Sequence, residues 1–579
     1  MSVSPIKIGT QQRLSLSAVV EVARGRAVSL NPRSRKLLSQ RRRQIVAHVH
    51  SHPEPAYGFN RGFGHNVDRA VAPQDLSELQ RNLIRSHSCA VGECVSIEVV
   101  RGAMVLRAHS LAQGHSGVRP EVVDALLTFL NRGITPCVPA YGSVGASGDL
   151  APLSHIALAL IGEGFVFDAT GKKVKATRAL ARAKIKPLAL EMKEGLALNN
   201  GMQFSTALAI LSHADMQKLL KTAALATAMT AQVMLASDLP FAEEVHKLRP
   251  HPGARAVSKW IWNLMQNSPM RECHRNFDID GEIQDPYNLR CAGQILGTCH
   301  DLLEQAGATL EIEANSVTDN PLLLNERGGS YTRIVSAGHF HGMPVAVALY
   351  NLTQAMGIMA RLSNMRCVRY VDENRNKGLG PDLVWPELRT EERAASSAMM
   401  VPEYVSAALT NAIWGAAMPS HLFSLSTDAG QEDHVSMAAG LGVRVYDTLP
   451  RLAEVLAIEL AFAAQAAAIR KISDTLPTKH KLTAQQTAQV KKAQESFTAA
   501  VRSANKRSAF EPKVDIQLRY RWSKKDRALS PPCEAVLRHI SKVFPIVKKD
   551  RSTSEQLRAL ADIVRSGTLL EHARKAFAA

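Results

Sequence analysis

Aromatic side chains are scarce in this chain: Phe, Trp and Tyr together make up 5% of its 579 residues. Sheets rely on aromatic and β-branched side chains, whereas alanine and leucine, which are abundant here, are strong helix formers. The shortage argues against a sheet-based fold and predicts a mainly α-helical protein. The length is sufficient for a large core and several domains.

Cysteine pairs with metal-site or redox spacing are also missing. The eight cysteines are scattered, and none belongs to a Cys-x-x-Cys pair. This pattern indicates neither a zinc site nor a disulfide framework. We therefore expect no metal site, and reduced thiols in a cytoplasmic protein.

Signals for membrane insertion are weak. Residues 1–10 lack the apolar run of a secretory signal peptide. Residues 222–239 and 452–469 are apolar, but the first stretch is rich in alanine and threonine, and the second contains Glu454 and Glu459. We expect both to be buried helices of a large bundle, in a protein without a membrane partner.

Acidic residues are outnumbered, because 70 Lys and Arg against 52 Asp and Glu give a formal net charge of +18 at pH 7. Basic chains often bind nucleic acid. Here the basic residues are not interleaved with aromatic ones on a recognisable nucleic-acid module. We expect a solvated basic surface rather than a nucleic-acid partner.

The most informative stretch is residues 142–155, which read Gly-Ser-Val-Gly-Ala-Ser-Gly-Asp-Leu-Ala-Pro-Leu-Ser-His. Its centre alone, Ala146-Ser147-Gly148, would indicate no more than a small-residue loop before a helix. The whole stretch resembles the signature of the aromatic amino-acid ammonia-lyases. That family includes histidine, phenylalanine and tyrosine ammonia-lyases and related aminomutases.

The resemblance implies that Ala146, Ser147 and Gly148 form a prosthetic group without an external cofactor. The backbone nitrogen of Gly148 attacks the carbonyl carbon of Ala146, since a glycine nitrogen is unhindered and its backbone is permissive. Loss of two waters, the second from the Ser147 side chain, leaves a 4-methylidene-imidazol-5-one, a carbon electrophile. Residues 150–161 predict an apolar helix with Asp149 as its N-cap, and its positive end would face this ring.

Two further motifs match family positions that act on the substrate and on this group. Tyr57 lies in a glycine-rich loop, residues 56–64, at the position of the catalytic base, and Arg61 replaces the usual threonine there. Asn200, within residues 193–201, takes the position of the asparagine that hydrogen-bonds the ring. Without the resemblance, Tyr57 would be an ordinary loop tyrosine and Asn200 a helix-capping residue.

Residues 284–291 place an amide, a phenol and a guanidinium in one turn, which suits a carboxylate site. Arg290 can bind a carboxylate through two parallel hydrogen bonds, and Gln284 and Tyr287 would complete the site. All three match family positions, and Tyr287 is also expected to act in catalysis. The resemblance further places Asn315 against the substrate carboxylate.

Another set of matched residues is expected to face the substrate's side-chain ring. At the position of His87, phenylalanine suits a phenyl ring, whereas histidine suits imidazole or phenol. A carboxylate at Glu432 pairs with a ring N–H and disfavours a phenyl ring, which would leave it unpaired. The remaining expected pocket residues are Phe340, His341 and Met400. The sequence departs from the family pattern at His339 and Gly430, where asparagine is usual.

The fold that the resemblance implies is that of the fumarase/aspartase-like superfamily. We expect an N-terminal domain that carries the prosthetic group (residues 1–200), followed by a central bundle of long helices (201–472). The C-terminal region (473–579) begins with a polar, basic insertion at about 473–528, which contributes much of the positive charge.

As a whole, the resemblance predicts an ammonia-lyase for an aromatic L-amino acid. His87 and Glu432 favour L-histidine, which would give urocanate. Tyrosine or phenylalanine as the substrate, and a 2,3-aminomutase that returns ammonia to the β-carbon, stay open. An inactive basic scaffold is the alternative from another class. The family also implies a homotetramer whose sites draw residues from three subunits, with Tyr57 and Arg290 on different chains.

Overall fold

The computed structural model describes residues 4–51, 57–62, 68–274, 284–325, 332–473 and 523–578. These residues form mostly α-helices with a few short sheets, which confirms the predicted mainly α-helical fold. The chain divides into two compact units. Unit 1 contains Met1–Lys218, Cys299–Gly357 and Ala412–Pro450, and unit 2 contains Leu219–Thr298, Ile358–Asn411 and Arg451–Ala579.

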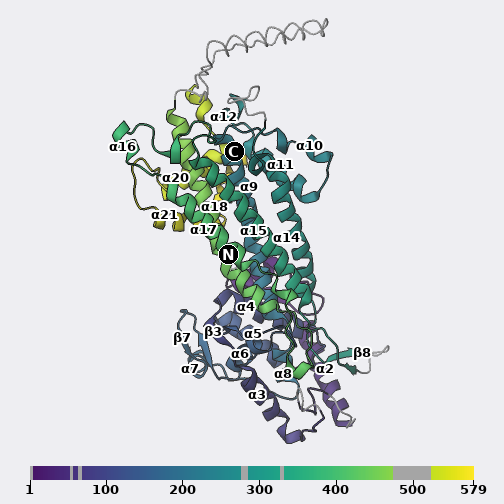
Figure 1. Ribbon diagram of the computed structural model, residues 1–579. Helices are drawn as coiled ribbons and strands as arrows, with labels where there is room; N and C mark the ends of the chain where they lie inside the picture. Colours follow the sequence, from purple (N-terminus) through teal and green to yellow (C-terminus); the bar gives the residue numbers. More distant parts are fainter. Residues whose placement is uncertain are drawn as a thin grey trace, which may run out of the picture. The chain divides into compact units, whose positions relative to one another are not determined.

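Unit 1 contains small sheets and short helices (Figure 1). Two strand pairs are β1 (Ile6–Ile8) with β2 (Val28–Leu30), which is parallel, and β3 (Val91–Cys94) with β5 (Pro139–Tyr141), which is antiparallel. The other sheets are antiparallel and contain β4 (Thr135–Pro136), β6 (Phe165–Phe167) and β7 (Lys173–Lys175), and β8 (Leu322–Asn325) and β9 (Thr332–Val335). Its shorter helices are α1 (Leu16–Ala23), α2 (Pro32–Ser51), α3 (Leu76–His87), α4 (Ile97–Leu111), α5 (Pro120–Arg132), α6 (Leu150–Leu160), α7 (Ala176–Ala183) and α8 (Glu194–Asn199).

The helix expected from residue 150 is α6, and it begins directly after the Ala146-Ser147-Gly148 loop. Pro152 lies in its first turn, where the missing N–H has no intrahelical partner to lose. Leu153 and Ile156 are buried on its inner side, which fixes the helix in the core of unit 1. The loop is therefore attached to a rigid element at its C-terminal end.

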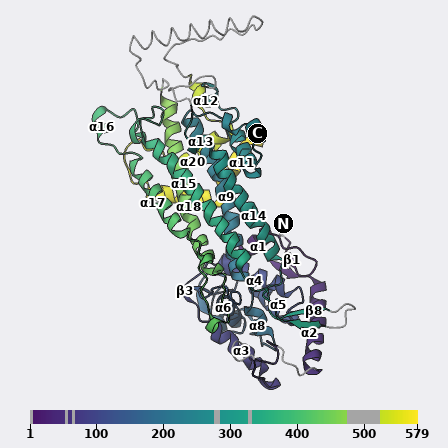
Figure 2. The ribbon, with the colours of Figure 1, turned by 45° about the vertical axis from the view of Figure 1, so that its right-hand side comes forward.

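Long helices pass from one unit into the other, namely α9 (Gln203–Val233), α14 (Ala292–Ala314), α15 (Met343–Val371), α17 (Met400–Ala416) and α18 (Ala438–Ile472). Within unit 2, segments of α9, α15 and α18 lie side by side (Figures 1 and 2) and share one buried carboxylate. Glu459 of α18 accepts hydrogen bonds from Thr230 of α9 and from Ser363 and Arg366 of α15. The other described helices of unit 2 are α10 (Glu243–Lys247), α11 (Pro252–Met265), α12 (Pro269–Glu272), α13 (Tyr287–Arg290), α16 (Thr390–Ala394), α20 (Pro531–Val543), α21 (Ser554–Ser566) and α22 (Thr568–Ala578).

Two described helices, α15 and α18, are long and apolar enough to cross a membrane by length and composition. Their most apolar windows are 61% and 89% buried inside the protein, and α18 includes the predicted core helix at 452–469. Core helices of large bundles pass the same test, so the finding is weak evidence for a span. Of the expected basic insertion at 473–528, residues 474–522 lie outside the described residues.

Candidate active site

The loop that carries Ser147 packs against the residues just before α9. Gly148 has a φ of 80°, and a Cβ at this position would lie 2.4 Å from the carbonyl oxygen of Gly201. The backbone N–H of Asp149 donates to the same oxygen at 2.7 Å. Only glycine fits at position 148, because the left-handed backbone and the close approach of another segment both exclude a side chain.

Asn200 contacts the central serine directly. Its Nδ2 donates to the carbonyl oxygen of Ser147 at 3.1 Å. Its Oδ1 is buried and has no hydrogen-bond partner among the residues that the structure describes. A ring closed between the nitrogen of Gly148 and the carbonyl carbon of Ala146 retains the Ser147 carbonyl oxygen. The asparagine is therefore bonded to an oxygen that would belong to the expected ring.

Asp149 does not act as the side-chain N-cap of α6, since its carboxylate makes no capping bond to that helix. Its Oδ2 accepts from the backbone N–H of Ser205 at 2.8 Å, and its Oδ1 accepts from the hydroxyls of Ser205 (2.8 Å) and Ser143 (2.9 Å). Ser205 lies in the first turn of α9, so the carboxylate stabilises the N-terminus of α9 instead. Burial raises the pKa of Asp149 to about 6, although these hydrogen-bond donors oppose the shift.

A second carboxyl group with a raised pKa interacts with Asp149. Burial, together with the charge of Asp149, raises the pKa of Glu313 from 4.5 to about 7. Between pH 4.5 and about 7, Glu313 is protonated in the folded protein and ionised in the unfolded chain. The free energy of unfolding that this group contributes therefore falls as the pH rises. We expect Glu313→Gln to become progressively more stable than the wild type from pH 4.5 to 7, as measured by urea denaturation. Glu555→Gln, at an exposed position of α21, is the control, and a Glu313→Gln difference that is constant with pH would contradict the assignment.

One of the residues expected to select the substrate ring, Glu432, lies beside Ser147. The Ser147 Oγ donates to Oε1 of Glu432 at 2.6 Å. Burial lowers the pKa of His87, while a hydrogen bond to the Leu83 backbone and the charge of Glu432 oppose that shift. The structure therefore brings Ser147 and Glu432 together from distant parts of the sequence, and the charge of Glu432 acts on His87.

His341 lies between β9 and α15 and contacts the segment that carries Glu432. Its Nε2 donates to the backbone carbonyl of His434 at 3.1 Å, and the two rings stack with centroids 5.9 Å apart. Phe340 is half-buried, whereas His339 is exposed. His339, which replaces the usual asparagine of the family, therefore lies on the surface of the described chain.

Tyr57 lies in a turn whose following residues are fixed in unit 1. A Cβ on Gly58 would lie 2.6 Å from the Leu196 side chain, and Phe59 is fully buried. Nη1 of Arg61 donates to the backbone carbonyl of Asp68 at 3.1 Å. Arg61 therefore joins the loop to Asp68 further along the chain, which is a role that its long side chain can fill where threonine is usual.

Asn315, expected at the substrate carboxylate, is engaged by the chain itself. Its Oδ1 accepts from the backbone N–H of Leu14 at 2.8 Å. Its Nδ2 donates to the carbonyl oxygens of Leu14 (3.1 Å) and Glu311 (2.8 Å). The amide joins the segment before α1 to the end of α14, so a substrate carboxylate would have to displace existing bonds.

The other expected carboxylate ligands and Met400 belong to unit 2. The Arg290 guanidinium lies 5.0 Å from the centre of the Tyr287 ring, which is 69% exposed. The Nε of Arg290 is buried and has no acceptor within the described part of the chain. Gln284 is exposed, and Met400 is the first residue of α17. Arg290 therefore retains an unused donor, as a residue that binds an anion requires.

Two supporting residues were not predicted from the sequence. Lys193, which is fully buried, forms an ion pair with the buried Asp319 at 2.8 Å just before the helix that leads to Asn200. The Oγ1 of Thr427 donates to Oε2 of Glu432 at 2.7 Å. Lys193 could have been singled out from the sequence, because it is a charged residue in the mostly apolar motif around Asn200. Nothing in the sequence indicated a role for Thr427.

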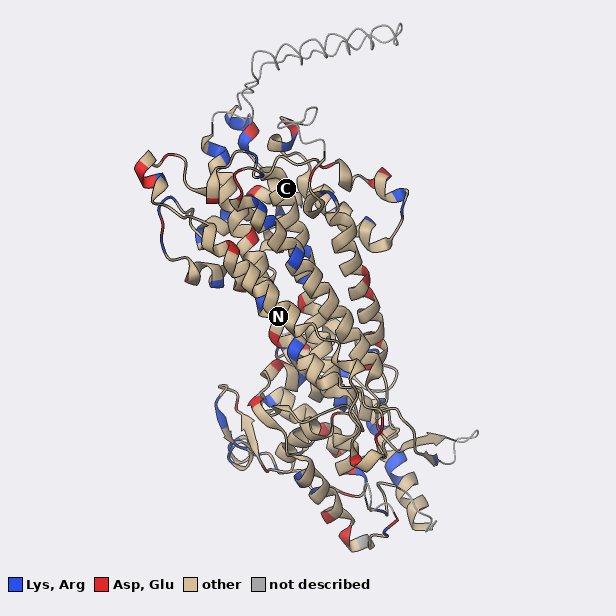
Figure 3. Cartoon of the chain, viewed as in Figure 1, with Lys and Arg blue, Asp and Glu red and all other residues tan. Residues whose placement is uncertain are grey.

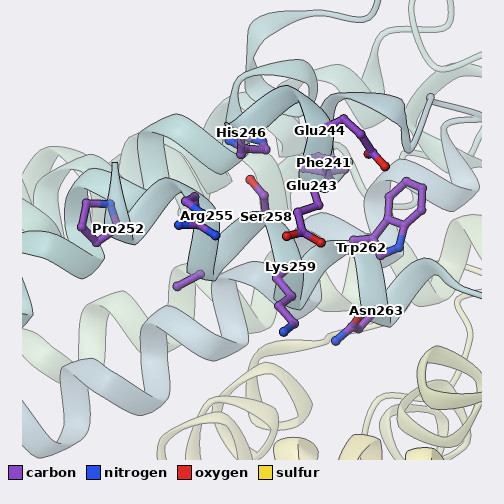
Figure 4. Close-up of a pocket in the computed structure, with 11 residues that line it drawn as sticks. Phe241, Glu243, Glu244, His246, Pro252, Arg255, Ser258, Lys259, Trp262 and Asn263 are labelled. Atoms are coloured by element: carbon purple, nitrogen blue, oxygen red, sulfur yellow. The ribbon is translucent and has the colours of Figure 1, made fainter. Parts of the chain in front are cut away.

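A separate cavity of about 600 Å³ lies in unit 2, lined by residues of α10 and α11 (Figure 4). Side chains of both charges line it, with Glu243 and Glu244 opposing Arg255 and Lys259. None of the predicted site residues belongs to its lining. The cavity is therefore distinct from the residues gathered around Ser147 in unit 1.

The class of protein follows from comparison with known families. The family model described as aromatic amino acid lyase matches residues 14–502. The chain belongs to the aromatic amino acid lyase family. It is a carbon–nitrogen lyase with the mostly helical, fumarase/aspartase-like fold that the sequence predicted.

Individual relatives support this placement. A histidine ammonia-lyase of Gloeobacter violaceus is 42% identical over 461 residues, which cover 79% of this chain and 86% of the relative. The structure of tyrosine aminomutase from Streptomyces globisporus matches with a TM-score of 0.82 and 28% identity, covering 99% of both chains. Histidine ammonia-lyase from Trypanosoma cruzi matches with a TM-score of 0.78 and 26% identity, covering 98% of this chain and 95% of that one.

Proposed function

We propose that this protein is an ammonia-lyase that converts L-histidine to urocanate and ammonia. The observation that supports this most strongly is the hydrogen bond from the Ser147 hydroxyl to the carboxylate of Glu432, whose charge also acts on His87. A carboxylate at this place favours a ring with an N–H donor, because a phenyl ring would leave it without a partner. The 42% identical relative, itself a histidine ammonia-lyase, supports the same substrate.

The residues around Ser147 fit a 4-methylidene-imidazol-5-one formed from Ala146, Ser147 and Gly148. Gly148 lies where no side chain fits, and Asn200 would hold the ring through the Ser147 carbonyl oxygen. When formed, the group supplies an electrophilic carbon that turns the substrate's amine into a better leaving group.

Other residues would bind the substrate and move its proton. Tyr57 would remove the β-proton as general base, and Arg290, with Gln284 and Tyr287, would hold the carboxylate. Asn315 would join that contact only by giving up its bonds to Leu14. The proposed ring pocket contains His87, Glu432, Phe340, His341 and Met400.

A cytoplasmic homotetramer, in which Tyr57 and Arg290 of different chains meet in one site, is part of the proposal. Large apolar side chains precede Glu432 at the surface, with Leu422 68% exposed and Phe423 58% exposed. Such surfaces commonly mark subunit contacts. Basic and acidic residues are interspersed over the described elements (Figure 3), which supports a solvated surface rather than a nucleic-acid site.

The substrate is tested by ultraviolet absorbance with L-histidine, L-tyrosine and L-phenylalanine supplied separately. We expect urocanate from L-histidine as the main product, because an imidazole N–H satisfies Glu432 whereas a phenyl ring leaves it unpaired. Coumarate from tyrosine in place of urocanate would overturn histidine as the substrate and keep the lyase class.

Two alternatives have their own signatures. A β-amino acid found by chromatography would identify a 2,3-aminomutase, which the likeness to tyrosine aminomutase makes the second candidate. An unmodified mass and no product from any of the three amino acids would instead favour the inactive basic scaffold.

A further inference from the structure

The turn that ends at Glu432 has an unusual backbone. Asp428, Ala429 and Gly430 have φ values of 47°, 52° and 95° in succession. Left-handed residues are uncommon outside glycine, so three in a row indicate a turn that its surroundings hold in place. Glycine suits position 430 better than the usual asparagine at such a φ, which accounts for that departure from the family pattern.

Main-chain hydrogen bonds close this turn. The N–H of Thr427 donates to the carbonyl oxygen of Glu432 at 3.0 Å, and the N–H of Glu432 donates to the carbonyl oxygen of Thr427 at 3.3 Å. The two residues form an isolated antiparallel bridge. The backbone thus closes the turn without help from the Thr427 side chain.

The Thr427 hydroxyl instead binds the Glu432 carboxylate. Its Oγ1 donates to Oε2 at 2.7 Å, while the Ser147 hydroxyl donates to Oε1 at 2.6 Å. The proposed prosthetic group forms with loss of the Ser147 hydroxyl as water, whereas the Thr427 hydroxyl remains. Maturation therefore releases one carboxylate oxygen and leaves the other bound.

From this geometry we infer that Thr427 is a positioning residue that determines substrate specificity. The Thr427 hydroxyl binds Oε2 of Glu432 and holds the carboxylate in place. Only Oε1 of Glu432 is then available to a ligand beside Ser147. A site built in this way accepts a ring that offers one hydrogen-bond donor and rejects a ring that offers none. The inference rests on the proposed function, since it assigns Glu432 to the substrate ring.

The test compares Thr427→Val with Thr427→Ser in the full-length enzyme. We expect Thr427→Val to lower kcat/KM for L-histidine about thirtyfold, mainly through KM, which corresponds to about 2 kcal/mol for a hydrogen bond to a charged group. Activity toward L-phenylalanine should change less, so the ratio between the two substrates should fall. Thr427→Ser, which keeps the hydroxyl, should restore the ratio.

The matched control is Thr230→Val in unit 2. Thr230 also donates from its hydroxyl to a glutamate, at 2.8 Å to Glu459, but it is fully buried and lies outside the residues assigned to the site. This variant should lose thermal stability without a change in the substrate ratio. A Thr427→Val enzyme that behaves in the same way would overturn the inference, because a purely structural role predicts that result.

A crystal structure of Thr427→Val provides a readout that does not depend on turnover. We expect the Glu432 carboxylate to leave the position seen here, and an unchanged side chain would overturn the inference. If the wild type acts on tyrosine instead of histidine, the proposed substrate is wrong. Thr427 is then tested by the same variants with tyrosine, since a phenol also offers one donor.

Discussion

Replacing Ser147 with alanine is expected to leave the chain at its unmodified mass and to lower kcat by roughly 10³-fold or more, as loss of a covalent catalytic group does. Ser147 is the source of the exocyclic carbon in the proposed prosthetic group, and alanine has no hydroxyl to lose. The variant should still fold, because Asn200 binds the backbone oxygen of residue 147 rather than its side chain.

Intact mass spectrometry and the urocanate assay measure this prediction together. The wild type should be lighter than its sequence by two waters, about 36 Da, and Ser147→Ala should show no such difference. Ser212→Ala is the control, since the Ser212 hydroxyl is buried and has no hydrogen-bond partner in the described structure. It should keep both the mass difference and the activity. A wild type without the mass difference would exclude the electrophile.

The mainly helical fold was predictable because it depends on composition and on local periodicity. The motif around Ser147 was predictable for a different reason, since its chemistry lies in consecutive residues. The pairing of His87 with Glu432 has no local signal, and only the family resemblance indicated it. The structure supplies the hydrogen bond between Ser147 and Glu432 and the effect of the Glu432 charge on His87.

Local rules failed where a side chain bonds to a distant backbone. Asp149 precedes α6 and has the residue type of an N-cap, yet its carboxylate binds the N-terminus of α9 at Ser205. Asn315 holds the main chain of Leu14, a contact that any residue type except proline at position 14 would allow. Such partners cannot be read from the sequence, because the donor or acceptor is a peptide group common to every residue.

Replacing Glu459 with alanine is expected to lower the free energy of unfolding by about 3–5 kcal/mol, the cost of leaving one member of a buried ion pair alone. Glu459 is fully buried, and its two oxygens bind Nε and Nη2 of Arg366 at 2.5 and 2.8 Å. Thr230 and Ser363 donate to the same carboxylate at 2.8 and 2.7 Å. The substitution therefore leaves a buried guanidinium and two hydroxyls without their acceptor.

Urea denaturation at fixed protein concentration measures this effect, with two companion variants to separate charge from shape. Glu459→Gln keeps the side-chain volume and one acceptor, so it should lose less stability than Glu459→Ala. Glu454→Ala removes the other carboxylate of the apolar stretch from a partly exposed position and should cost about 1 kcal/mol or less. Equal losses for Glu454→Ala and Glu459→Ala would show that the buried carboxylate does not stabilise the bundle. The expected difference would show that the charge which argued against a membrane span joins α9, α15 and α18 inside the protein.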